Sequence, residues 1–204
     1  MLSDTCYVVL DNYQKWKGEA PNVFTPDSAS PNLSPRFGIL EYASSPQFNT
    51  YCTVGASYQI IPHSQCGNEG CSGVRYEYIL HAPSQHRIDA CELLLIVASY
   101  PFLEGFEYYA GCVLPIGSPV VEHSSMTHLY FTYPYLDDPK IYDTKPYGQI
   151  KIGSLLIQTL WVFPVYESEA EYVHSAGADA FEQCCYERHS QQYDAFDFFR
   201  VPIV

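Results

Sequence analysis

The chain has few charged residues for its length, and basic residues are the scarcest of them. Of 204 residues, 16% are charged, with 10 Lys or Arg against 23 Asp or Glu, which gives a formal net charge of −13. A surface this acidic repels nucleic acid and anionic lipid, so neither is an expected partner. It favours a basic protein partner. Acidity is also a common way for a protein to stay in solution, and on charge alone that explanation is the simpler one.

Long apolar runs are also missing. No run reaches the roughly 18 residues that a membrane span needs. The first residues lack a basic start, and their apolar patch, Tyr7 to Leu10, is too short for a signal peptide. We therefore expect a cytoplasmic protein that does not enter a membrane.

Sequence motifs of common enzymes are absent as well. The chain has no Walker loop, no G-x-G-x-x-G, no G-x-S-x-G and no H-E-x-x-H. Nothing in it therefore designates a catalytic residue, and no cofactor is expected.

The residues that are abundant favour a folded domain. Hydrophobic residues make up 47% of the chain, with 19 Tyr and 11 Phe, which is enough for one domain with a sizeable core. We find no internal repeat, linker or low-complexity segment. The sequence therefore predicts a single domain over residues 1–204, with a core at about 37–183, a proline-rich loop at 18–35 and a C-terminal tail at 193–204 that docks on the body.

Hydrophobic periodicity predicts an α+β fold, in which a largely antiparallel central sheet packs against helices. The run Leu155 to Val165 is almost continuously apolar, which is typical of a central strand that is buried on both faces. Gly153-Ser154 suits a hairpin turn before that strand. Other strands are expected at 37–42, 50–61, 75–81, 127–133 and 147–152, and helices at 6–17, 84–100, 167–175 and 178–189.

Two local expectations accompany these elements. Ser84 is a suitable N-cap for the helix 84–100, and Gly55 marks a bulge or close approach within the strand 50–61. The spacing of that helix predicts an apolar face of five residues: Ile88, Cys91, Leu95, Ala98 and Phe102.

Five short motifs stand in order over most of the chain. They are TVGAS (53–57), RYEYIL (75–80), ELLLIVASYP (92–101), GCVLP (111–115), and a strand ending in Pro164-Val165 that is followed by GADA (177–180). In this order the chain resembles the suppressor-of-fused domain. Two features depart from the family pattern: the glycine- and cysteine-containing stretch 67–73 and the aromatic C-terminal end.

The resemblance implies a protein that binds other proteins and carries no catalytic motif. Bacterial members are similar to immunity proteins, which bind and neutralise a toxin, and the animal member holds a transcription factor in the cytoplasm. The resemblance thus implies an immunity protein, and the acidic charge suggests a basic toxin. The alternatives are a cytoplasmic regulator that sequesters another protein, or a hydrolase that uses Cys and His residues.

The cysteines carry the hydrolase and metal alternatives. His63, Cys66 and Cys71 have side chains that zinc prefers, but their spacing is not that of a zinc knuckle and no second pair follows. A disulfide between Cys66 and Cys71 is a further possibility, and two free thiols are the simplest one. Cys184 and Cys185 precede His189, yet adjacent helical residues point to different faces, so core packing is the better interpretation.

An aromatic strand followed by an acidic loop is the candidate partner surface. Tyrosine buries a large area with few rotatable bonds, which suits protein binding, although it also fills the edges of sheets. Carboxylates beside it would suit a basic partner, and the loop lacks the regular alternation of a calcium site. The candidate residues are Tyr130, Tyr133, Tyr135, Asp137, Asp138 and Asp143.

Overall fold

A computed structural model describes residues 3–17, 22–26, 31–61, 75–134, 149–152, 155–189 and 196–204. Its strands are β1 (Asn22–Phe24), β2 (Gly38–Ala43), β3 (Phe48–Val54), β4 (Arg75–Pro83), β5 (Val113–Pro115), β6 (His128–Thr132), β7 (Gln149–Ile152) and β8 (Leu155–Val165). The helices are α1 (Ser3–Lys17), α2 (Arg87–Glu104), α3 (Glu167–Ala176) and α4 (Ala178–His189), with short 3-10 turns η1 (Ala56–Tyr58) and η2 (Ser84–His86).

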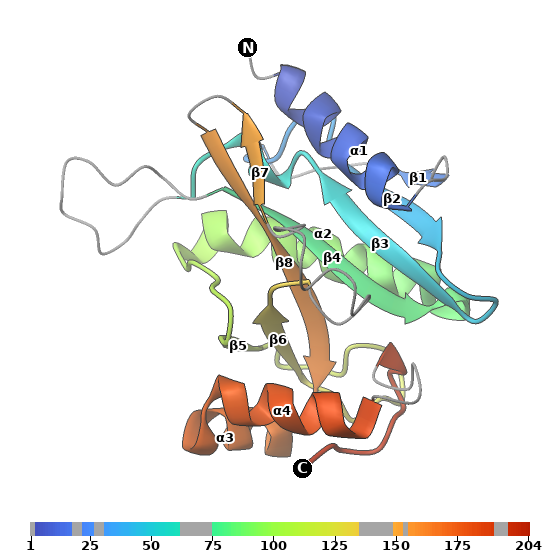
Figure 1. Cartoon of the computed structure of the whole chain (residues 1–204), viewed down its shortest axis with the longest axis vertical. Coiled ribbons are helices and arrows are strands. Elements are labelled where there is room, and N and C mark those ends of the chain that lie inside the picture. Colours follow the sequence, from blue (N-terminus) through green and yellow to red (C-terminus); the bar gives the residue numbers. More distant parts are fainter. Residues whose placement is uncertain are drawn as a thin grey trace, which may run out of the picture.

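The described strands form one eight-stranded sheet with helices on both faces (Figure 1). The strand order is β1-β2-β3-β4-β8-β6-β5, and β7 pairs with β8 off this path. Among the described strands, the pair β4–β8 is parallel and the other pairs are antiparallel. The prediction of an α+β fold with a largely antiparallel sheet is confirmed.

Strand β8 is central and buried, as its apolar run predicts. It lies between β4 and β6, and β7 pairs with its first half. Leu160 and Trp161 point to opposite faces and are both fully buried. The strand shows no polar alternation because helices or the C-terminal segment cover both of its faces. The predicted β7–β8 hairpin is also present, while its turn, 153–154, lies outside the described residues.

Two cores lie on the two sides of the sheet. The first is formed by α2 and includes Tyr78, Leu94, Phe131 and Leu160. The second joins α1, α3 and α4 to the opposite face. The C-terminal segment 196–204 reaches both cores, because Phe198 belongs to the first and Phe196 and Ile203 to the second. Residues 196–204 therefore pack against the body of the protein.

Helix α2 differs from its prediction. Ser84 does not cap it but begins the turn η2, and the helix runs past Pro101 to Glu104. Of the five residues of its predicted apolar face, Cys91 and Ala98 are buried, Leu95 and Phe102 are partly buried, and Ile88 is exposed. The buried face extends to Leu94, Val97 and Pro101, because α2 is apolar around most of its circumference and periodicity alone does not fix where the buried face is centred.

Two further boundaries are corrected. The predicted strand 50–61 ends at Val54, because Gly55 adopts a left-handed conformation (φ +94°) and the chain turns into η1. The proline-rich stretch 18–35 contains the short strand β1, which pairs with β2 at the edge of the sheet. Proline is tolerated next to an edge strand, since one side of that strand needs no ladder hydrogen bonds. None of the helices in the described residues is long and apolar enough to cross a membrane.

Candidate functional site

Tyr130, one of the candidate partner residues, is a core residue. It lies on β6, where α4 covers its face, and its ring packs edge-on against Phe181 at 5.1 Å. Its hydroxyl donates to Glu182 Oε1 at 2.6 Å, and Thr132 donates to the same oxygen at 2.7 Å. The ring is therefore not available to a partner, which corrects its assignment to an outer surface. The alternation of polar and apolar residues in β6 does not reveal that α4 lies over it.

Tyr133, two residues beyond Phe131, is different because its side chain is 44% exposed. The segment 105–112 lies beside this end of β6, where Gly111 N donates to Phe131 O at 2.7 Å. That segment exposes two more aromatic side chains, Phe106 and Tyr109. We call Phe106, Tyr109 and Tyr133 the aromatic patch.

One carboxylate, that of Glu107, belongs to the same segment as Phe106 and Tyr109. Glu107 accepts a hydrogen bond from the Tyr76 hydroxyl at 3.2 Å. Burial raises the pKa of Tyr76, and Glu107 and Tyr133 raise it further, which places both near that hydroxyl. The patch is thus aromatic with an acidic group beside it. Tyr135, Asp137, Asp138 and Asp143 follow it in the chain but lie outside the described residues, as do His63, Cys66 and Cys71.

The TVGAS and RYEYIL motifs meet at one buried carboxylate, that of Glu77. Its oxygens accept hydrogen bonds from Thr53 Oγ1 at 2.7 Å, Gly55 N at 2.9 Å and Ser57 Oγ at 2.6 Å. Arg75 donates to the carbonyl oxygens of Ser57 and Tyr58. Burial raises the pKa of Glu77, while the hydrogen bonds to its oxygens oppose that rise. This carboxylate fixes the turn after β3 and is not presented to a substrate.

Two glycines of the motifs mark close approaches between segments. A Cβ on Gly55 would lie 2.7 Å from Ser34 Cβ, and one on Gly111 would lie 2.9 Å from Ala178 Cβ. Both residues have φ of +94°, which L side chains rarely adopt. The second contact joins the GCVLP and GADA motifs in space.

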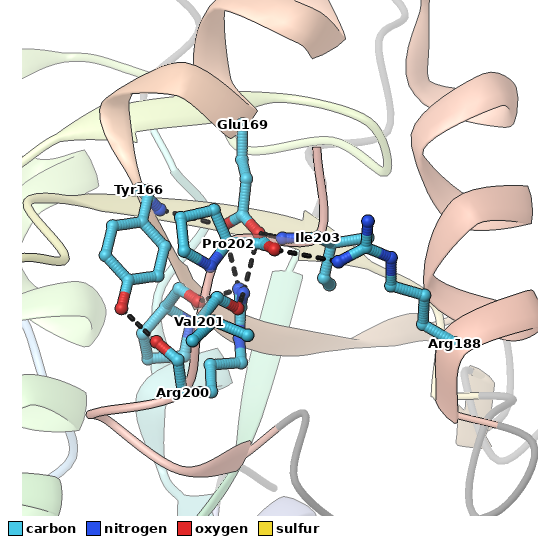
Figure 2. A network of polar contacts seen from close by, with 8 residues as sticks. Tyr166, Glu169, Arg188, Arg200, Val201, Pro202 and Ile203 are labelled. Atoms are coloured by element: carbon cyan, nitrogen blue, oxygen red, sulfur yellow. Dashed lines mark hydrogen bonds and ion pairs between the residues drawn. The ribbon is translucent and has the colours of Figure 1, made fainter.

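A second buried carboxylate holds the C-terminal segment. Glu169 Oε1 and Arg200 lie 2.6 Å apart, with side chains 0% and 3% exposed (Figure 2). The carboxylate also accepts from Tyr166 N at 2.8 Å and Ile203 N at 2.7 Å. We call Glu169, Arg200 and these partners the C-terminal clasp.

Further contacts complete the C-terminal clasp. Arg200 donates to Pro164 O at 3.2 Å, and the Tyr166 hydroxyl donates to Arg200 O. At the margin, Arg188 donates to Pro202 O at 3.0 Å (Figure 2). Because its donors and acceptors are matched within the protein, the clasp is a structural device rather than an acid–base pair.

Three of the described cysteines, Cys91, Cys112 and Cys185, are poor nucleophiles. Burial raises the pKa of Cys185 to about 12 and those of Cys91 and Cys112 to about 11. A thiol with such a pKa is almost fully protonated at neutral pH, and the thiolate is the reactive form. Cys184 lies beside the Tyr172 hydroxyl, at 3.9 Å. Within the described residues, no group of three or more His, Cys, Asp or Glu could hold a metal ion.

The sequence was compared with known protein families and matches one of them. The family model of the suppressor of fused protein (SUFU) matches residues 34–200, which include Glu77, Glu169 and Arg200. No curated protein matches the chain.

Solved structures share the fold. A Neisseria gonorrhoeae protein described as a SUFU homologue has a TM-score of 0.70 and 19% identity, and the match covers 99% of this chain and 98% of that one. A chain of the Sufu–Fu complex has a TM-score of 0.72 and 13% identity, with 98% and 92% covered. Drosophila Suppressor of Fused also gives 0.72 and 13%, but this chain spans only 51% of it. The family match covers most of the sequence, and the chain therefore belongs to the suppressor of fused protein (SUFU) family.

Proposed function

We propose that the chain is a non-catalytic protein-binding domain that acts in the cytoplasm, most concretely an immunity protein that binds and neutralises a basic toxin. The observation that carries the proposal is its membership of the suppressor of fused family, of which one similar structure is that of the Sufu–Fu complex. The net charge of −13 supports a basic partner. The raised thiol pKa values speak against nucleophilic catalysis by Cys91, Cys112 and Cys185.

We place the partner contact at the aromatic patch and the acidic loop that follows Tyr133. Phe106, Tyr109 and Tyr133 are exposed, and rings of this size are common anchors in protein interfaces. Tyr135, Asp137, Asp138 and Asp143 are the loop residues proposed to complete this surface. Carboxylates around aromatic anchors would pair with Lys and Arg on a basic partner.

The immunity role is tested by co-expression with the protein encoded next to this one. We expect the neighbour to arrest growth when it is expressed alone and to be harmless when this chain is present. A neighbour that is harmless alone would remove the immunity role. A neighbour that this chain pulls down without neutralising would instead favour a regulator that sequesters its partner.

The contact surface gives a second expected result. The variant Tyr133→Ala, Tyr135→Ala, Asp138→Lys should bind the partner at least tenfold more weakly, because it loses two anchors and one favourable charge. Binding is measured by calorimetry, with thermal unfolding as a check of the fold. The matched control is Tyr7→Ala, Tyr186→Ala, Glu171→Lys, which changes exposed residues of α1, α4 and α3. Equal affinities for parent and first variant would show that this face is not the interface.

The salt dependence of partner binding gives a third expected result. We expect the association rate with the partner to fall as salt increases, because surface charges are screened over about 8 Å at physiological ionic strength. The dissociation rate should change less. Stopped-flow or surface-binding kinetics at low and high salt measure both rates. An association rate that stays flat would mean an apolar interface, with the acidity serving only solubility.

The hydrolase alternative has its own test. If the purified protein turned over a substrate and one Cys→Ala change abolished that activity, the binding-only proposal would be wrong. The side chain of His189 and the residues His63, Cys66 and Cys71 lie outside the part of the chain that the structure describes, so they are included in the set of variants.

A further inference from the structure

Helix α2 carries an apolar stripe on the side that faces away from the sheet. Ile88, Ile96 and Leu103 have side chains that are 54%, 55% and 69% exposed. They follow one another at intervals of eight and seven residues, which are close to two turns of an α-helix. At about 100° per residue, all three fall within roughly 80° of arc. The stripe is about 22 Å long at 1.5 Å per residue.

The stripe is opposite the buried face of the same helix. Leu94, Val97 and Pro101 pack into the first core, and Tyr51 and Tyr78 meet them there from the sheet. Leu95 and Phe102, which are partly buried, border the exposed stripe. A surface helix normally turns polar residues outward. An apolar outer stripe on a soluble protein is a recognised mark of an interaction surface.

The charges within and beside the stripe are acidic. At 100° per residue, Glu92 falls inside the stripe, between Ile88 and Ile96, whereas Asp89 and Glu104 fall on one flank of it; Glu92 and Glu104 are exposed. The cation at the start of the helix, Arg87, falls on the other flank and binds Glu41 at 2.7 Å. Asp89 is 3.0 Å from His86, which is charged only when protonated. The exposed flank is therefore negative.

We infer that the outer face of α2 docks an amphipathic helix of a partner protein, with apolar residues on one face and Lys or Arg along one flank. A stripe about four turns long fits a partner helix of about 15 residues. The acidic flank selects a basic helix over an acidic one. This surface differs from the aromatic patch, and the inference holds whether or not the partner is a toxin.

A second copy of the chain fits this face less well. An antiparallel pairing about Ile96 would set Asp89 of one copy against the apolar Leu103 of the other. A parallel pairing would bring Glu92 and Glu104 together with their own copies, and like charges in contact repel. The acidic flank thus has a better match in a basic helix.

A synthetic peptide tests the inference without knowledge of the natural partner. The probe is a helical peptide of about 18 residues with Leu on one face and Lys elsewhere. A scrambled peptide of the same composition and a Leu/Glu peptide of the same pattern are the comparisons. We expect the patterned Leu/Lys peptide to bind in calorimetry, and the two others to bind at least tenfold more weakly.

Variants locate the binding. Ile96→Ser with Leu103→Ser should weaken the peptide about tenfold or more, whereas Val23→Ser with Val201→Ser, at exposed apolar positions outside α2, should leave it unchanged. Glu92→Lys with Glu104→Lys should also weaken it, and Glu167→Lys with Glu171→Lys on α3, which has the same net charge, should weaken it less.

Three results would overturn the inference. The first is equal peptide affinity for the α2 variants and their controls. The second is equal binding of the Leu/Glu peptide, which would remove the basic partner. The third is a dimer of the parent protein in sedimentation that Ile96→Ser with Leu103→Ser dissociates, because the occupant would then be a second copy. Neutralisation of the toxin by the α2 variants is scored separately, so failure here and failure of the proposed function remain distinct.

Discussion

Replacing Arg200 with Met is expected to destabilise the protein by about 3–5 kcal/mol, because it leaves a buried carboxylate without its cation. Glu169 is completely buried, and Arg200 supplies two of its hydrogen bonds. Methionine keeps most of the unbranched aliphatic stem but is shorter than arginine, so the lost charge is expected to outweigh the lost packing. The free energy of unfolding is measured in urea, with the C-terminal segment expected to become accessible to protease in the native state.

Two controls separate the lost charge from general damage. Arg188→Met removes one exposed contact to Pro202 O and should cost less than about 1 kcal/mol. The double variant Glu169→Gln, Arg200→Met should be more stable than Arg200→Met alone, because no unpaired charge stays buried. If Arg200→Met behaved like Arg188→Met, the C-terminal clasp would not be holding the tail.

Leu160→Asp is expected to have an effect at least as large, and to leave most of the protein insoluble. Leu160 lies in the middle of β8, fully buried in the first core with Val162. An aspartate there would have to bury a charge without a partner or open the sheet. The soluble fraction on expression and the urea midpoint of the soluble material measure the effect.

Two control variants, Leu160→Ala and Gln158→Asp, separate the effect of lost packing from the effect of a buried charge. The alanine variant loses only packing and should cost about 2–5 kcal/mol. The second places the same charge on the same strand at a position that is partly exposed, and its cost should be much smaller. Soluble Leu160→Asp protein that unfolds cooperatively near the parent midpoint would contradict the central position of β8.

Two buried carboxylates fix loops against the sheet. Glu77 fixes the turn between β3 and η1, and Glu169 fixes the C-terminal segment beside β8. Both carboxylates are buried and accept backbone N–H groups, so each ties a loop to the sheet.

Strand β8 and helices α3 and α4 could be predicted from the sequence because their signals are local. An eleven-residue apolar run, a break at Tyr166 and a glycine at 177 set their limits within a residue or two. The motif order also identified the family before any fold was known. The limits of these elements and the family resemblance thus follow from local residue patterns and from the order of the motifs along the chain.

Helix α2 and Tyr130 show where the sequence was not enough. The apolar residues of α2 surround most of the helix, so only its contact with β4 decides that Leu94 is buried and Ile96 is not. Tyr130 lies in the core that α4 covers, whereas Tyr133 lies just beyond the end of β6 and is exposed. Whether a side chain is buried depends on which distant segment of the chain packs against it, and the local spacing of residues does not carry that information.

The two carboxylate sites divide in the same way. The sequence determined that Glu77 stands in a strand and that Glu169 stands at the start of a helix. Only the tertiary structure decided that Glu77 meets a turn twenty residues before it in the chain. It also decided that Glu169 meets Arg200, because these two residues are 31 positions apart in the sequence. A charge can be buried only where its partner is brought to it, and the whole chain must fold to do so.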